Sequence, residues 1–188
     1  ELVNKLGKNN ISNEVLLPQK NKHTIPIIEK GNSLQTRNCP VSNRISSKCI
    51  KCKHCSIMEG FGGAGAFSDG KFNITNDFGG ALSEKIGKEN SLKLQEEIDE
   101  INCNILNKLN IPIGTLFESA DTKFHKICIQ NKLQLLNANI RHLGTDKNYK
   151  ILEYLYNYLI DNNVVFKFNE EVEKITKTNV SSYYITTN

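Results

Sequence analysis

The fold class follows from one run of residues, Thr24-Ile25-Pro26-Ile27-Ile28-Glu29-Lys30-Gly31. It is short and apolar and ends in an acid, a base and a glycine, which is typical of a buried parallel strand that runs into a turn. Pro26 has no backbone N–H to donate, so it favours either the start of a strand or a strand at the edge of the sheet. In dinucleotide-binding units a carboxylate at such a strand end accepts hydrogen bonds from ribose hydroxyls. Glu29 has this position, although an acid that ends a strand for solubility gives the same pattern.

Helical patterns follow this strand. Residues 91–109 predict a covering helix whose apolar face is Leu94, Ile98, Ile101 and Ile105. Ser119 is placed to cap a second covering helix, which carries Phe124, Ile127 and Cys128. Thr145 or Asp146 is expected to cap a third, amphipathic helix with Ile151, Leu152, Leu155 and Leu159.

Extended patterns occur at residues 135–140, 164–168, 172–175 and 182–187. Together with the helices they predict an α/β fold that contains a parallel sheet. Residues 1–7 have the pattern of a helix that lacks a capping residue, so we expect a further segment upstream of Glu1.

Composition narrows the class of protein. At 188 residues the chain is long enough for one domain or slightly more. Its 24 basic and 20 acidic residues are interleaved, which argues against a nucleic-acid partner. The sequence has no run of about 18 apolar residues and no signal-peptide pattern, so we expect a cytoplasmic protein without a membrane span.

The glycine-rich stretch Gly60-Phe61-Gly62-Gly63-Ala64-Gly65-Ala66-Phe67-Ser68-Asp69-Gly70-Lys71 is a more specific feature. Because it has almost no side chains between Gly62 and Gly65, its backbone amides can approach an anionic or planar ligand. A Walker loop requires Ser or Thr after Gly-Lys, and Phe72 stands there, which excludes a kinase or nucleotide hydrolase of that type. A flexible glycine hinge is the alternative interpretation.

Four cysteines precede this stretch, at Cys39, Cys49, Cys52 and Cys55. Short Cys-x-x-Cys steps let neighbouring sulfurs converge on one centre, so the four predict an iron–sulfur cluster or a zinc site. Adjacent lysines at Lys48, Lys51 and Lys53 favour the thiolate form. Four reduced cysteines in a loop are the alternative, and the spacing suits the cytosol.

His142 is a candidate for proton transfer, because an imidazole titrates near neutrality and Asp146 is placed to orient it. A histidine that serves only in a turn gives the same local sequence. His142 and Asp146 are therefore predicted as a catalytic pair, with the turn histidine as the alternative.

Together these motifs resemble a family of bacterial FAD-dependent dehydrogenases, which is related to the glutathione-reductase-type flavoproteins. The resemblance covers most of residues 24–175. The pairing of Gly-Gly-Ala-Gly-x-Phe-Ser-Asp-Gly-Lys with a downstream His-x-Gly-Thr-Asp is its most specific part. The runs that carry it are Glu29-Lys30-Gly31, Arg37-Asn38-Cys39-Pro40, Cys49-x-x-Cys52-x-x-Cys55-Ser56-Ile57-Met58, the block from Gly60 to Lys71, and Arg141-His142-Leu143-Gly144-Thr145-Asp146.

The resemblance implies an FAD-dependent oxidoreductase in which the flavin carries the redox chemistry. Its fold would be α/β, a partial Rossmann-like FAD/NAD(P)-binding domain with a parallel sheet and inserted helical and β substrate elements. Residues 1–80 would form a partial FAD-binding domain with the cysteine-rich and glycine-rich loops. Residues 81–145 would be a mainly helical, substrate-side insertion, and residues 146–188 would return to the FAD-binding domain.

The same resemblance implies roles for single residues. Glu29, with Lys30 beside it, would hold the adenosine ribose, Arg37 would lie near the phosphates, and the backbone of Val172 would meet the adenine. The turn from His142 to Asp146 would face the substrate. The remaining cofactor contacts would come from the glycine-rich stretch, through Gly62, Gly63, Ala64, Gly65, Ser68, Asp69, Gly70 and Lys71.

The family's Gly-x-Gly-x-x-Gly loop is expected before Glu1, and its Ala-Thr-Gly-like turn after Asn188. The chain is therefore interpreted as an interior piece that is inactive alone. The substrate, the electron partner and any use of NAD(P) stay open. Two alternatives also stay open: a cysteine-cluster metal-binding or interaction module without turnover, and a truncated, inactive gene product.

Overall fold

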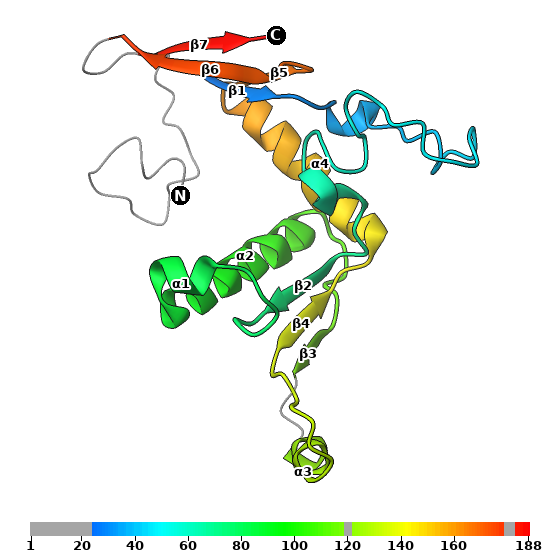
Figure 1. Cartoon of the computed structure of the whole chain (residues 1–188), viewed down its shortest axis with the longest axis vertical. Helices are drawn as coiled ribbons and strands as arrows, with labels where there is room; N and C mark the ends of the chain where they lie inside the picture. The colour runs from blue at the N-terminus through cyan, green and yellow to red at the C-terminus, as the bar shows by residue number, and fades with distance from the viewer. Residues whose placement is uncertain (1–23, 119–121, 179–182) are drawn as a thin grey trace.

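The structure, a computed structural model, describes residues 24–118, 122–178 and 183–188. The helical pattern at residues 1–7 and the cap predicted at Ser119 lie outside these residues. The described chain has a mixed α/β fold with one small parallel sheet and two antiparallel sheets, which confirms the α/β class (Figure 1). No helix in these residues is long and apolar enough to cross a membrane.

The parallel sheet consists of two strands, β1 (Ile25–Glu29) and β5 (Val164–Phe168), with Glu29 opposite Phe168. Parallel strands need a crossover connection, and helix α4 (Thr145–Asp161) leads into β5. This helix packs against one face of the pair, where Tyr156 stacks on Phe166 at 5.3 Å between ring centroids. Both predicted strands are confirmed, but the prediction that the first one is buried was wrong, because β1 has a strand partner on one side only in the described residues and Ile25 is 45% exposed.

The start of α4 differs from the expectation. Thr145 is already helical and Gly144 is the N-cap, with φ of 86° and no side-chain cap, so the prediction that Thr145 or Asp146 caps the helix was wrong. The cause is tertiary. The chain turns at Gly144, directly against Gly70: a Cβ added to Gly70 would lie 2.9 Å from the carbonyl oxygen of Gly144. The turn needs a positive φ at Gly144, which glycine adopts without steric cost.

A three-stranded antiparallel sheet forms the second part of the fold. Its order is β2 (Lys71–Ile74), β4 (Asn139–His142) and β3 (Leu116–Glu118). Helices α1 (Leu82–Ile86) and α2 (Lys88–Lys108) lie beside it. The buried core joins this part to α4 and contains Ile105, Leu106, Leu143 and Ile151.

Helix α2 confirms the prediction for residues 91–109, but its buried face differs. Ile98 and Ile101 are 50% and 38% exposed, whereas Asp99 and Asn102 are buried. Asp99 turns inward because it accepts hydrogen bonds from Arg141, at 2.9 Å from Nε and 2.7 Å from Nη2. A buried ion pair thus overrides the apolar periodicity.

The remaining elements are a hairpin, an arm and two short 3-10 turns. Strands β6 (Val172–Lys177) and β7 (Tyr183–Thr187) pair as an antiparallel hairpin, as expected for this segment. Helix α3 (Thr122–Gln130) is present, but it stands at the end of an arm and does not cover the sheet (Figure 1). The 3-10 turns are η1 (Leu34–Thr36) and η2 (Gly63–Phe67).

Candidate functional site

Glu29 lies at the carboxyl end of β1 and is held by backbone amides. Its Oε1 accepts hydrogen bonds from the N–H of Gly31 at 2.8 Å and of Gly60 at 3.0 Å. Within the described residues no hydrogen bond occupies Oε2. The two amides therefore fix the orientation of the carboxylate, and Oε2 carries no hydrogen bond from any residue that the structure describes.

A pocket of about 400 Å³ opens beside this carboxylate. It combines four predicted cofactor residues, Glu29, Lys30, Gly63 and Val172, with residues that were not predicted to contact the cofactor. Those further lining residues are Ile28, Met58, Glu59, Gly60, Glu170 and Glu171. The pocket lies where strands β1 and β5 end, the edge at which open parallel sheets bind ligands.

Among the described residues that line the pocket, four are acidic and one, Lys30, is basic and lies in an ion pair. Lys30 Nζ lies 3.1 Å from Glu59 Oε1, and His54 Nδ1 lies 3.5 Å from Glu59 Oε2. The ammonium of Lys30 lowers the pKa of Glu59, and Glu59 raises the pKa of Lys30. Such a pocket suits neutral hydroxyls and a base better than it suits a phosphate.

Arg37 organises the loop that closes the pocket. Its buried guanidinium donates to four carbonyl oxygens: Ser56 and Ile57 at 2.9 Å, and Phe61 and Gly63 at 2.7 Å. Four of its five N–H donors are thus used within the protein. Arg37 shapes the loop here, and contact with a phosphate stays a prediction.

The glycine-rich stretch is held through its carbonyl groups, while space is open beside the Cα atoms of Gly63 and Gly65. Asn148 of α4 donates from Nδ2 to the carbonyl of Gly65 at 2.7 Å. A Cβ added at Gly63 or Gly65 would meet none of the described atoms within 4 Å. Gly63 needs its glycine for a φ of 55°. At Gly65 neither backbone conformation nor internal crowding excludes a side chain, which leaves room for an external ligand against this backbone.

The two sequence blocks of the resemblance meet at Gly70. Its carbonyl accepts the N–H of Leu143 at 2.9 Å, and Lys71 pairs with His142 across β2 and β4. Ser68 Oγ accepts the N–H of Gly70 at 3.1 Å. The two blocks, about 70 residues apart in the sequence, are therefore neighbours in the fold. No periodicity in the sequence indicated that they would meet.

The proposed catalytic pair is not preformed. In the described chain no hydrogen bond or ion pair joins His142 to Asp146, and both side chains are exposed. His142 instead lies near Asp69, whose carboxylate contacts Lys71 Nζ at 2.8 Å. Lys71 is the main cause of the lowered pKa of Asp69, and His142 adds to it.

The four cysteines do not form a ready metal site. Cys49 and Cys52 are exposed and Cys39 and Cys55 partly buried, all as free thiols. Among the described residues no three His, Cys, Asp or Glu side chains come together as metal ligands. Backbone N–H groups of Ser42 and Val41 lower the pKa of Cys39. The arrangement gives no geometric support for zinc or an iron–sulfur cluster, and that site stays a prediction.

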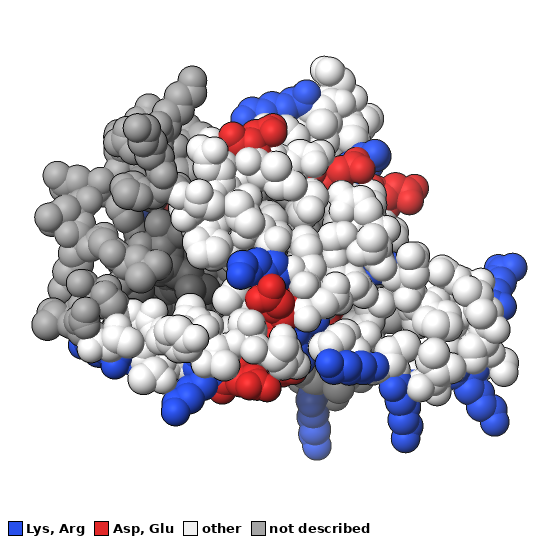
Figure 2. All heavy atoms as spheres, turned by 90° about the horizontal axis from the view of Figure 1, so that it is seen from above, with Lys and Arg blue, Asp and Glu red and all other residues white. Residues whose placement is uncertain are grey.

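Sequence reasoning missed several residues of the site, chiefly Met58, Glu59, Asn148, Glu170 and Glu171. Acidic and basic side chains are both present on the face that Figure 2 displays.

Comparison with protein-family models, with curated proteins and with solved structures found no match to this chain.

Proposed function

We propose that the pocket beside Glu29 binds the adenosine end of FAD, and that the protein is an FAD-dependent oxidoreductase. The observation that carries this proposal is the fixed carboxylate at the end of a parallel strand, with one oxygen engaged by two amides and the other open. A vicinal diol of ribose donates two hydrogen bonds, which a carboxylate accepts well.

The surroundings of the carboxylate support an adenosine ligand. The pocket has apolar side chains, Ile28, Met58 and Val172, that suit the faces of a purine, next to the polar Glu29. Its volume of about 400 Å³ is in the range of small-ligand pockets. The acidic side chains disfavour a phosphate at this end, so the pyrophosphate would leave the pocket towards the open backbone at Gly63 and Gly65.

Flavin, when bound, would supply hydride or electron transfer, and the protein would supply placement and electrostatics. Exposed His142, Asp69 and Lys71 lie together where the end of the glycine-rich stretch pairs with β4, and each can carry a proton. Their role towards a substrate belongs to the same proposal.

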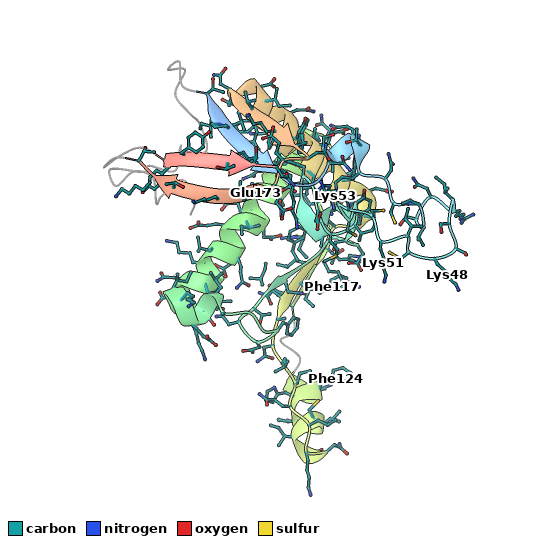
Figure 3. All side chains as sticks on the ribbon, turned by 45° about the horizontal axis from the view of Figure 1, so that its top comes forward. Lys48, Lys51, Lys53, Phe117, Phe124 and Glu173 are labelled. Atoms are coloured by element: carbon teal, nitrogen blue, oxygen red, sulfur yellow. The ribbon has the colours of Figure 1, made fainter. Side chains whose placement is uncertain are left out.

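The test is a titration of the protein with ADP, FAD and NAD by calorimetry. Glu29→Gln is the sharp variant, because its amide oxygen can still accept from Gly31 and Gly60 while its NH₂ replaces the open acceptor oxygen. We expect ADP and FAD affinity to fall at least about tenfold, the loss of one charge-assisted hydrogen bond. Glu173→Gln, an exposed glutamate on β6 labelled in Figure 3, is the matched control and should bind as the parent does.

Three outcomes decide the matter. Binding of ADP and FAD that is lost in Glu29→Gln, with an unchanged thermal midpoint, supports the proposal. If the protein binds NAD but not FAD, the ligand of this pocket is a nicotinamide dinucleotide and the FAD proposal is wrong. If the protein ignores ADP, FAD and NAD at millimolar concentration, the proposal is wrong.

A further inference from the structure

An arm formed by β3, α3 and β4 ends in exposed apolar side chains. Phe124 and Ile129 are each 62% exposed, Ile127 is 51% exposed and Leu133 is 63% exposed. Figures 1 and 3 both show α3 at the far end of the arm from α4. Exposed apolar groups gathered on one element commonly mark a binding surface. We call residues 122–133, which are α3 and the turn up to Leu133, the arm tip.

Helix α3 is amphipathic along its nine residues. Phe124, Ile127 and Cys128 follow the i, i+3, i+4 spacing and share one face. Lys123, one turn before Ile127, flanks this face, whereas Lys126 and Ile129 lie on the opposite side of the helix. This division places a hydrophobic surface beside cations, which is the pattern of a helix that lies in the plane of a membrane interface.

The charged residues from the start of α3 to Thr145 are basic or histidine. From residue 122 to residue 145 the sequence contains no Asp or Glu, whereas Glu118 and Asp121 precede the helix. The cations on the arm tip are Lys123, Lys126 and Lys132. Two copies of this surface would bring like charges together, which disfavours self-association. An anionic partner is complementary to it.

We propose that the arm tip docks on an anionic phospholipid bilayer, with Phe124 and Ile127 entering the interface and the lysines near the headgroups. The anionic leaflet attracts juxtamembrane lysines, and apolar side chains add affinity by leaving water. The contact is peripheral and needs no spanning helix. It also does not depend on the pocket at Glu29.

Charge is tested first, by flotation of the full chain with vesicles of phosphatidylcholine containing about 30 mol% phosphatidylserine. The variant replaces Lys123, Lys126 and Lys132 by Gln. Its matched control makes the same three-charge change in the cysteine loop, at Lys48, Lys51 and Lys53, which Figure 3 labels away from the arm. We expect the arm variant to lose about 100-fold in partitioning, roughly fivefold per lysine, and the control to lose little.

Insertion is tested by fluorescence. The chain contains no tryptophan, so Phe124→Trp places a single reporter on the arm tip. Phe78→Trp is the control, because Phe78 is 48% exposed but lies before α1, in another part of the fold. With the anionic vesicles we expect a blue-shifted emission for Phe124→Trp and an unchanged emission for Phe78→Trp.

Several results would overturn the proposal. One is a failure of the parent chain to float with anionic vesicles, and another is an equal loss in the two triple-lysine variants, which would reduce the effect to net charge. Retention on immobilised polyglutamate without vesicle binding would point to an acidic protein partner instead. Dimer formation that Phe124→Asp abolishes would point to a second copy.

Discussion

Replacing Arg37 by Met should open the loop that closes the pocket. The guanidinium makes four hydrogen bonds to backbone carbonyls between Ser56 and Gly63, at 2.7 to 2.9 Å. Bonds from a charged donor contribute about 1.5 kcal/mol each at the low end, or about 6 kcal/mol together. Relief from burying the charge returns roughly half of this. We therefore expect Arg37→Met to lower the free energy of unfolding by about 3 kcal/mol.

Urea unfolding measures this loss, and amide hydrogen exchange locates it. The amides of Phe61 and Gly63, which donate to Asn32 and Gly60 at 3.1 and 2.8 Å, should exchange faster in the variant. Arg37→Lys should recover part of the stability, because one ammonium cannot reach four carbonyls in different directions. Arg44→Met, at an exposed arginine in the preceding loop, is the control and should change stability by less than about 0.5 kcal/mol.

The reasoning about Arg37 is refuted by a specific result. If Arg37→Met costs less than about 1 kcal/mol and leaves the exchange of Phe61 and Gly63 unchanged, the guanidinium does not hold this loop. Equal effects of Arg37→Met and Arg44→Met would give the same answer.

Three further predictions concern stability. Asp99→Asn should cost about 3 kcal/mol in urea unfolding, because it leaves the partly buried Arg141 without its charge partner, whereas Glu100→Gln at the exposed next position should be silent; equal effects would contradict the ion pair. Gly70→Ala should lower the free energy of unfolding by about 1–3 kcal/mol, because the new side chain would combine a φ of 69° with a Cβ 2.9 Å from the carbonyl oxygen of Gly144. Gly65→Ala is the control, since a Cβ there meets open space and the variant should fold normally. A Gly70→Ala variant as stable as the parent would contradict the close approach. Lys30 lowers the pKa of Glu59, so their contact stabilises the fold above pH 4.5, the ordinary pKa of that group, and is lost as the pH falls through the lowered folded value; the urea midpoint of Glu59→Gln should fall less over this acid range than that of the parent, and parallel acid profiles would refute the linkage.

Local patterns predicted several elements well. The strand at Ile25–Glu29 and the strands at residues 164–168 and 172–175 follow from apolar and alternating runs, and α2 and α4 follow from helical spacing. The strand predicted at residues 135–140 appears later, as β4 at Asn139–His142. Strands β2 and β3 were missed because each has only three or four residues and is defined by its pairing with β4.

The candidate site divides in a similar way. Glu29 and the glycine-rich backbone were found from sequence, since an acid after a strand and a run of glycines are local signals. Glu59, Asn148, Glu170 and Glu171 gave no such signal, because three tertiary features bring them to the site. Glu59 arrives with the loop that hydrogen-bonds to Glu29, Asn148 with the packing of α4, and the other two with the turn after β5. The role of Arg37 in holding the loop was also invisible, since its acceptors lie 19 to 26 residues away.

Residue chemistry and spacing determined the α/β class, the position of Glu29 at a strand end and the open glycine backbone, because each depends on a few consecutive residues. The tertiary structure alone decided which side of α2 is buried, where the carboxylate's amide donors come from and how the loops at Gly70 and Gly144 meet. These features depend on contacts between segments distant in the chain. Their energy arises from burial and hydrogen bonding that no single segment contains.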